Sequence, residues 1–402
     1  MLRRARLRYP ELTFARADAH ALPLQGPFDV VIMSDVVNDL WDVQAVLGEI
    51  VKVSHPRTRI IITTYNRLWE LPLTAARALG LADPVLDQNW LTVEDVTNLL
   101  ELADAEPLRH WSEILCPVSI PAVSTFANRV VVKLWPFNAF GLTNVIVARP
   151  RTPLSRERRL QDREPLVSVV VPARNEAGNI RGIFERTPEM GRGTELLFVE
   201  GHSTDNTCAT IEAAIREHPE RCSRLLRQQG KGKGDAVRLG FAEASGDILM
   251  ILDADLTVAP EDLPRFLDAI RSGKAEFVNG SRLVYPMESE AMYFFNLVGN
   301  KFFSLAFSWL LGQPIKDTLC GTKVLWAADY AQIAANREYF GDFDPFGDFD
   351  LLFGAARISL KIVDMPIRYR ARTYGSTNIQ RWRHGALLLR MLAFAAHRLK
   401  FV

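Results

Sequence analysis

Residues 248–257 read ILMILDADLT, an apolar strand that runs directly into two acidic residues, Asp253 and Asp255. Side chains two residues apart on an extended chain point the same way, so both carboxylates project from one strand end. Proteins typically hold Mg²⁺ with one or two carboxylates together with the phosphates of a substrate. The stretch therefore predicts a site for a divalent cation and a diphosphate, with a pair of solvated turn acids as the alternative.

The sequence around this stretch alternates between apolar strands and amphipathic helices. Such alternation is typical of an open α/β fold with a parallel sheet, which binds ligands at the carboxyl ends of its strands. The expected strands are residues 167–171, 195–199, 223–226 and 247–252, and the expected helices are residues 178–186, 206–217 and 234–244.

A glycine-rich turn precedes the last of these helices. It reads QQGKGKGD and contains Lys231 and Lys233. Glycines let backbone N–H groups approach an anion closely, and the start of a helix adds positive potential. The turn is therefore a candidate for contact with phosphate, with a flexible basic loop as the alternative.

The length of 402 residues suits two domains. Residues 151–165 are polar and charged and predict a linker between a domain of residues 1–150 and a domain of residues 166–402. The expected elements before the linker are strands at residues 12–16, 28–33, 59–64 and 143–148 and helices at residues 43–53 and 93–102.

Composition excludes several classes of protein. A net charge of +1 is not that of a polycation that coats nucleic acid, and the four scattered cysteines form no metal-binding or disulfide pattern, which favours a cytoplasmic location. The longest apolar stretches, residues 302–312 and 385–396, fall short of the roughly 20 residues of a spanning helix, so we expect none. Residues 365–402 contain no acidic side chain, which favours peripheral association with a membrane, a solvated basic helix being the alternative.

Eight segments occur in the order found in a known family. They read VVVPARNE, VEGHSTDNT, GKGDAVRLGF, LDADLT, NGSR, DTLCGTK, FGDFD and PIRYRARTYGSTN. Residues 165–402 thereby resemble a family 2 glycosyltransferase of the GT-A fold, of the dolichol-phosphate mannose synthase-like branch. The resemblance implies an inverting transfer of a sugar from a GDP- or UDP-sugar to a polyprenyl phosphate, assisted by Mg²⁺ or Mn²⁺.

The resemblance also assigns roles to individual residues. It implies that Asp253 and Asp255 hold the metal. The implied catalytic residues are Asp253, Asp255, Asp348, Asp350 and Arg372. The implied nucleotide-sugar site consists of Pro172, Ala173, Arg174, Glu176, Glu200, Lys233, Asp253, Ala254, Asp255, Arg282 and Arg372.

The acceptor is less well defined, because the Arg-x-x-x-Ser pair that related synthases use for an acceptor phosphate is missing. A hydroxyl acceptor stays an alternative, and Asp348 or Asp350 would then take its proton. These two residues could instead cap a helix that begins at Leu351.

The first domain resembles a class I S-adenosylmethionine-dependent methyltransferase over residues 12–150. The matching segments read GPFDVVIMSDVVNDLWDVQAVLGEI, NWLTVEDVTNLLELADAE and LTNVIVARP, and Asp18 stands where relatives contact adenine. The glycine-rich cofactor turn is absent, so we expect an incomplete domain that does not bind the cofactor in this chain as given. A methyltransferase acting on a sugar or lipid and a non-catalytic scaffold are the rival functions.

Overall fold

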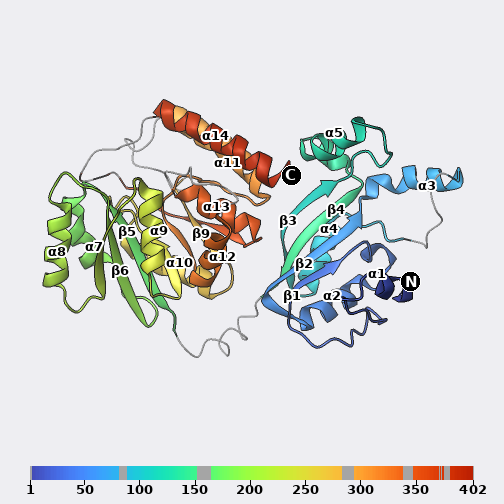
Figure 1. Ribbon diagram of the computed structural model, residues 1–402, viewed down its shortest axis with the longest axis horizontal. Helices are drawn as coiled ribbons and strands as arrows, with labels where there is room; N and C mark the ends of the chain where they lie inside the picture. Colours follow the sequence, from blue (N-terminus) through green and yellow to red (C-terminus); the bar gives the residue numbers. More distant parts are fainter. Residues whose placement is uncertain are drawn as a thin grey trace. The chain divides into compact units, whose positions relative to one another are not determined.

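The computed structural model describes residues 2–80, 88–151, 164–282, 294–337, 347–370, 372, 374 and 381–401. The chain divides into two compact units, Met1–Arg151 and Thr152–Val402 (Figure 1). Each unit has its own sheet.

The first unit is built on a four-stranded sheet of order β1-β2-β4-β3. The strands are β1 (Phe28–Met33), β2 (Ser54–Tyr65), β3 (Ala105–Glu113) and β4 (Thr143–Pro150). β1 is parallel to β2, whereas β4 is antiparallel to both β2 and β3. The expected strand at residues 12–16 does not form, because among the described residues this segment has no neighbouring strand to pair with.

Helices α2 (Val43–Lys52) and α4 (Val93–Leu102) pack on one face of this sheet. Asp42 caps α2, and Thr92 and Asp95 form a reciprocal capping box at the start of α4. These caps satisfy backbone donors at the helix starts and explain why the sequence-based bounds agree with the structure within one residue. The remaining helices of this unit are α1 (Leu2–Arg8), α3 (Glu70–Ala78) and α5 (Val123–Arg129), with short 3₁₀ turns at Val37–Asp39, Arg67–Trp69, Val131–Lys133 and Phe137–Phe140.

The second unit contains a seven-stranded sheet of order β11-β9-β10-β8-β5-β6-β7. Its strands are β5 (Leu166–Ala173), β6 (Gly193–Glu200), β7 (Ser223–Arg227), β8 (Ile248–Ile251), β9 (Phe277–Ser281), β10 (Lys323–Trp326) and β11 (Ile362–Pro366). Strands β8, β5, β6 and β7 are parallel, as expected. The sheet continues beyond these four strands with β10, which is antiparallel to both β8 and β9.

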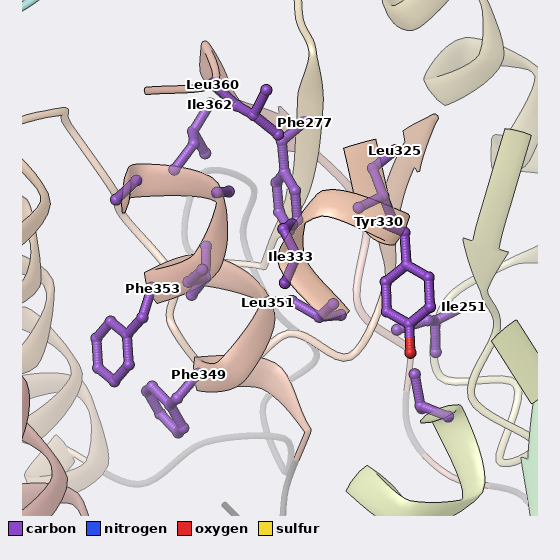
Figure 2. Close-up of a cluster of buried hydrophobic side chains, with 14 of the residues drawn as sticks. Ile251, Phe277, Leu325, Tyr330, Ile333, Phe349, Leu351, Phe353, Leu360 and Ile362 are labelled. Carbon is purple, nitrogen blue, oxygen red and sulfur yellow. The ribbon is translucent and has the colours of Figure 1, made fainter. Parts of the chain in front are cut away.

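Helices cover both faces of this sheet, and two hydrophobic clusters fill the space between. One face packs against α7 (Ile180–Arg186), α8 (Thr207–Glu217) and α10 (Leu263–Arg271). The other face packs against α9 (Lys233–Glu243), α12 (Ala327–Ala335) and α13 (Asp348–Arg357). Figure 2 shows Ile333 of α12 and Phe349 and Leu351 of α13 within the second cluster. The unit is therefore a three-layer α/β/α structure whose loops emerge at the strand ends.

Two long helices complete the second unit, α11 (Phe294–Leu311) and α14 (Arg381–Leu399), and they pack against each other. Leu310 and Leu311 of α11 and Leu388 and Met391 of α14 are buried in the same cluster as α13. Among the described residues, no helix combines the length and apolarity needed to cross a bilayer.

Candidate functional site

The two predicted metal ligands lie at the carboxyl end of β8, and each is paired with a cation from another loop. Lys233, the first residue of α9, contacts Oδ1 of Asp253. Arg372 donates from Nη2 to Oδ2 of Asp255 at 2.6 Å. The other oxygen of Asp255 accepts from the backbone N–H of Thr257 at 3.1 Å and from its hydroxyl at 2.8 Å. The pair is therefore a charge-balanced cluster and is not a pair of freely solvated turn acids.

Asp253 lies against the backbone of Gly321, which the sequence analysis left without a role. A Cβ atom at position 321 would lie 2.1 Å from both Oδ2 of Asp253 and Nζ of Lys233. Only glycine leaves room for this contact. Burial raises the pKa of Asp253, but the charge and hydrogen bond of Lys233, with smaller contributions from Lys323 and Arg282, outweigh burial, so the pKa lies below its usual value.

This close approach also explains the direction of β10. Gly321 stands at the carboxyl end of β8 and only two residues before β10 begins at Lys323. The chain therefore enters β10 at that edge of the sheet and can only run away from it, antiparallel to β8.

Arg372 joins Asp255 to a third carboxylate, that of Glu176. Nη1 of Arg372 lies 3.5 Å from Oε1 of Glu176, and the side chain of Asn179 donates to Oε2 at 2.7 Å. Burial raises the pKa of Glu176, and Arg372 and Asn179 offset this only in part. The backbone N–H of Arg370 donates to the carbonyl of Thr257 at 3.0 Å, which fastens the Arg372 segment to the turn after Asp255.

The turns after β5 and β6 form the neighbouring part of the site. Pro172 and Ala173 are the last residues of β5 and pair with Val199 and Glu200 of β6. Arg174 is exposed, whereas the carboxylate of Glu200 accepts from the backbone N–H of Ser203 at 2.5 Å. The side chain of Asn175, a residue with φ of 57°, accepts from the backbone N–H of Thr204 at 2.8 Å, which ties the two turns together.

Arg282, which the resemblance assigns to the nucleotide-sugar site, is paired with Asp317. Nε and Nη2 of Arg282 donate to the two oxygens of Asp317 at 2.7 and 2.9 Å, and its backbone N–H donates to the same carboxylate at 3.0 Å. The guanidinium also lies 5.2 Å from the ring centre of Tyr369. In this structure Arg282 therefore holds the segment that leads to Gly321.

A buried polar network supports the same segment. Lys323 is fully buried, and its ammonium donates to the carbonyl of Cys320 at 2.6 Å and to the side chain of Asn279 at 3.2 Å. Asn279 in turn donates to the carbonyl of Asp317 at 2.7 Å and to Asp364 at 2.8 Å. The sequence analysis quoted the segments NGSR and DTLCGTK but missed Asn279, Asp317, Gly321 and Lys323, because their roles arise from contacts across the sheet.

The two acidic residues assigned to the acceptor lie at the start of α13. Gly347, with φ of +72°, precedes this helix, and a Cβ atom there would lie 2.6 Å from Cα of Gly234, so α13 begins beside the start of α9. Asp350 is buried and accepts from Nε of Arg337 at 3.0 Å. The side chain of Asp348 lies outside the described residues.

Asp18 of the first unit lies in a separate exposed turn. Its carboxylate accepts from the backbone N–H of His20 at 3.0 Å, and hydrogen bonds from that residue lower the pKa of Asp18. The described contacts of Asp18 all lie within this local turn. The role of Asp18 toward adenine stays a prediction.

The donor set at the end of β8 fits a divalent cation whose coordination is completed by a ligand. Among the residues that the structure describes, no three His, Cys, Asp or Glu side chains cluster as a complete metal site. Carboxylate oxygens are suitable donors for Mg²⁺ or Mn²⁺, and sites with one or two of them use substrate phosphates as further ligands. Both carboxylates have a cationic partner in this structure, Lys233 at Asp253 and Arg372 at Asp255.

Comparison with known families agrees with this reading of both units. Residues 168–321 match the model described as glycosyl transferase family 2, and residues 2–103 match a model described as a methyltransferase domain. Residues 168–321 of the second unit are therefore similar to family 2 glycosyltransferases, and the predicted α/β fold of this unit is confirmed. The first unit carries a methyltransferase-like sequence, as the resemblance implied.

Similarity to individual proteins is partial. The chain is 35% identical over 120 residues to dolichol-phosphate mannosyltransferase of Pyrococcus furiosus, which covers 29% of the chain and 33% of that protein. It is 27% identical over 224 residues to glycosyltransferase AglJ of Haloferax volcanii, covering 55% and 69%. The chain thus spans about a third of the first relative. Glucosyl-3-phosphoglycerate synthase of Mycobacterium tuberculosis, solved with Mn²⁺ and UDP, aligns at 20% identity with a TM-score of 0.44, covering 62% of this chain and 85% of that one.

Proposed function

We propose that the second unit transfers a sugar, with inversion, from a nucleotide-diphosphate sugar to an acceptor. The observation that carries this proposal is the cluster of Asp253 and Asp255 with Lys233 and Arg372 at the carboxyl edge of the sheet. The two acids and Lys233 fall within the segment that matches family 2 glycosyltransferases. Ligands of open α/β sheets bind at this edge.

In this proposal the two acids and the two cations have different roles in binding and releasing a diphosphate. A Mg²⁺ or Mn²⁺ ion on Asp255 and Asp253 would neutralise charge that develops on the leaving diphosphate. Lys233 and Arg372 supply two further positive charges at the same edge. Preorganised charges of this kind act most strongly where charge develops in the transition state.

The acceptor that we propose is a polyprenyl phosphate. Its phosphate oxygen is already ionised at neutral pH and needs no general base, in contrast to a hydroxyl. The ion pair between Asp350 and Arg337 supports this choice, because Arg337 already occupies an oxygen of the carboxylate that would have to receive a hydroxyl proton. The similarity to a dolichol-phosphate mannosyltransferase points in the same direction.

Helix α14 offers a surface by which this unit could lie on a membrane. Leu388, Met391 and Ala395 on its inner face are buried, whereas Leu389 and Arg390 are exposed. We propose that the outer face contributes to peripheral membrane association.

Calorimetry with GDP and UDP, each with and without Mn²⁺, tests the proposed site. We expect one nucleotide to bind in a metal-dependent manner and Asp255→Ala to abolish the metal dependence. Asp268→Ala, which removes an exposed acid on α10, is the matched control and should bind as the unchanged chain does. Metal-independent binding, or full-strength binding by Asp255→Ala, would contradict the proposed site.

A further inference from the structure

The segment between β3 and β4 of the first unit presents an unusual number of large apolar side chains to solvent. It includes α5 and the two 3₁₀ turns that follow, which lie beyond the ends of β3 and β4 (Figure 1). Trp135 is 85% exposed and Phe126 is 61% exposed. The exposed apolar side chains of this segment are Val118, Ile120, Val123, Phe126, Leu134, Trp135, Phe137 and Phe140, here called the aromatic patch.

The backbone of the aromatic patch is held in place by hydrogen bonds from the side chains of Asn128, Asn66 and Trp69. Asn128 donates to the carbonyl of Cys116 at 2.9 Å and accepts from its backbone N–H at 2.7 Å. Asn66 donates to the carbonyls of Ala139 and Gly141, each at 2.9 Å, and the indole of Trp69 donates to the carbonyl of Phe140 at 2.8 Å. These hydrogen bonds fix the backbone that carries the exposed apolar side chains.

The charge of the segment identifies the kind of surface that would cover it. No Asp or Glu occurs between Ile114 and Arg149, a stretch that contains Arg129 and Lys133. Arg129 is exposed beside the patch, and Lys133 pairs with Glu113 at its inner border. Exposed Trp and Phe side chains beside an exposed basic residue such as Arg129 are typical of elements that lie in the interface of an anionic bilayer.

We propose that the aromatic patch is a docking surface for an anionic lipid bilayer. Val123 and Phe126 of α5 together with Trp135, Phe137 and Phe140 would enter the interface, and Arg129 would meet the headgroups. The proposal concerns the first unit and does not rest on the sugar transfer assigned to the second. Exposed apolar side chains gathered in one segment commonly mark a protein or membrane contact, and the absence of acidic residues between Ile114 and Arg149 favours the membrane.

Flotation of the full chain with vesicles of phosphatidylglycerol and phosphatidylethanolamine tests the proposal. We expect Trp135→Ser combined with Phe137→Ser to weaken partitioning by at least about tenfold, because the variant lacks two aromatic side chains that would be buried in the bilayer interface. Trp41→Ser is the matched control, because Trp41 is 96% exposed in the same unit but lies outside the patch. This control should float as the unchanged chain does.

Two further variants separate the possible sources of binding. Arg129→Glu should weaken partitioning into anionic vesicles and leave binding to phosphatidylcholine vesicles unchanged. Leu389→Ser on α14 removes apolar surface from the second unit and leaves the patch intact. If Leu389→Ser alone abolishes flotation while the Trp135 and Phe137 variant floats normally, the proposal is overturned. It is also overturned if the patch variants change the oligomeric mass of the chain in solution without changing flotation, since a second copy would then cover the patch.

Discussion

Breaking the ion pair of Asp317 with Arg282 should destabilise the second unit far more than breaking a surface pair of the same geometry. The Asp317 side chain is 1% exposed and the Arg282 side chain is 13% exposed. The carboxylate accepts three hydrogen bonds from Arg282 and one from the backbone N–H of Leu319 at 3.1 Å. Replacing Asp317 by Ala would leave a buried guanidinium without its partner, which costs about 3–5 kcal/mol of unfolding free energy.

The chain contains a matched pair that isolates the effect of burial. Nε and Nη2 of Arg186 donate to the two oxygens of Glu261 at 2.8 and 2.9 Å, the same two-pronged arrangement. These side chains are 32% and 54% exposed, so Glu261→Ala should cost only about 0.2–1 kcal/mol.

Hydrogen exchange measured on peptides from β5 and β8 gives the opening free energy of the second unit separately from the first. We expect a large loss of protection in Asp317→Ala and little change in Glu261→Ala. Equal losses in the two variants would refute the argument that burial, and not geometry, sets the strength of the pair.

The same pair predicts the sign of a pH effect. Burial raises the pKa of Asp317, but Arg282 and the hydrogen bonds to the carboxylate outweigh it, so the folded-state pKa lies below the value of about 3.9 in an unfolded chain. The ionised carboxylate of Asp317 therefore stabilises the fold above the unfolded-chain pKa of about 3.9. This stabilisation is lost as the pH falls through the lower pKa of the folded state. The stability difference between the unchanged chain and Asp317→Ala should shrink in acid, and a difference that grows there would show the opposite sign.

Two further substitutions test the site itself. Gly321→Ala places a methyl group against Asp253 and Lys233, and this overpacking costs about 1–3 kcal/mol. Calorimetry should show metal-dependent nucleotide binding that is weaker by at least about fivefold. Gly48→Ala is the control, because the space around position 48 is open, and it should leave binding unchanged. Arg372→Ala removes the cation that occupies Asp255, so Mn²⁺ alone should bind up to about fivefold tighter while nucleotide binding in the presence of Mn²⁺ weakens. Unchanged Mn²⁺ affinity in this variant would show that Arg372 and the metal do not compete.

Sequence patterns predicted the elements whose stability is local. β5 contains four valines and is flanked by breaks, and α4 begins with a capping box, so both could be located within one or two residues. β3 was not predicted, because AEPLRHWSE contains a proline and charged side chains and shows no apolar alternation. This segment is a strand because it pairs with β4. Such tertiary pairing leaves no periodic trace in the sequence.

The candidate site likewise has one part that is fixed by local sequence and another that is fixed by tertiary contacts. The acid pair could be predicted because an apolar strand that ends in Asp-Ala-Asp fixes both side chains at one place. The partners of this pair lie 20 residues before Asp253 and 117 residues after Asp255 in the chain. The buried pair of Arg282 and Asp317 likewise spans 35 residues. Charge and spacing in the sequence cannot identify which of these distant residues form ion pairs, because the strand order of the sheet brings the partners together.

The charge balance at the end of β8 bears on how a ligand would be admitted. Both acids already have a cationic partner, so a divalent ion enters by exchange and not by filling an open set of ligands. Loss of the contact between Arg372 and Asp255 would be offset if a diphosphate arriving with the metal offered the partly exposed guanidinium another anion. Lys233 is differently placed, because the backbone of Gly321 lies against both its ammonium and Asp253, and Arg282 and Lys323 hold the Gly321 segment from below. On the proposed function, Arg372 is therefore the group that moves from carboxylate to phosphate, and the Asp253–Lys233 pair is the fixed reference against which the donor is positioned.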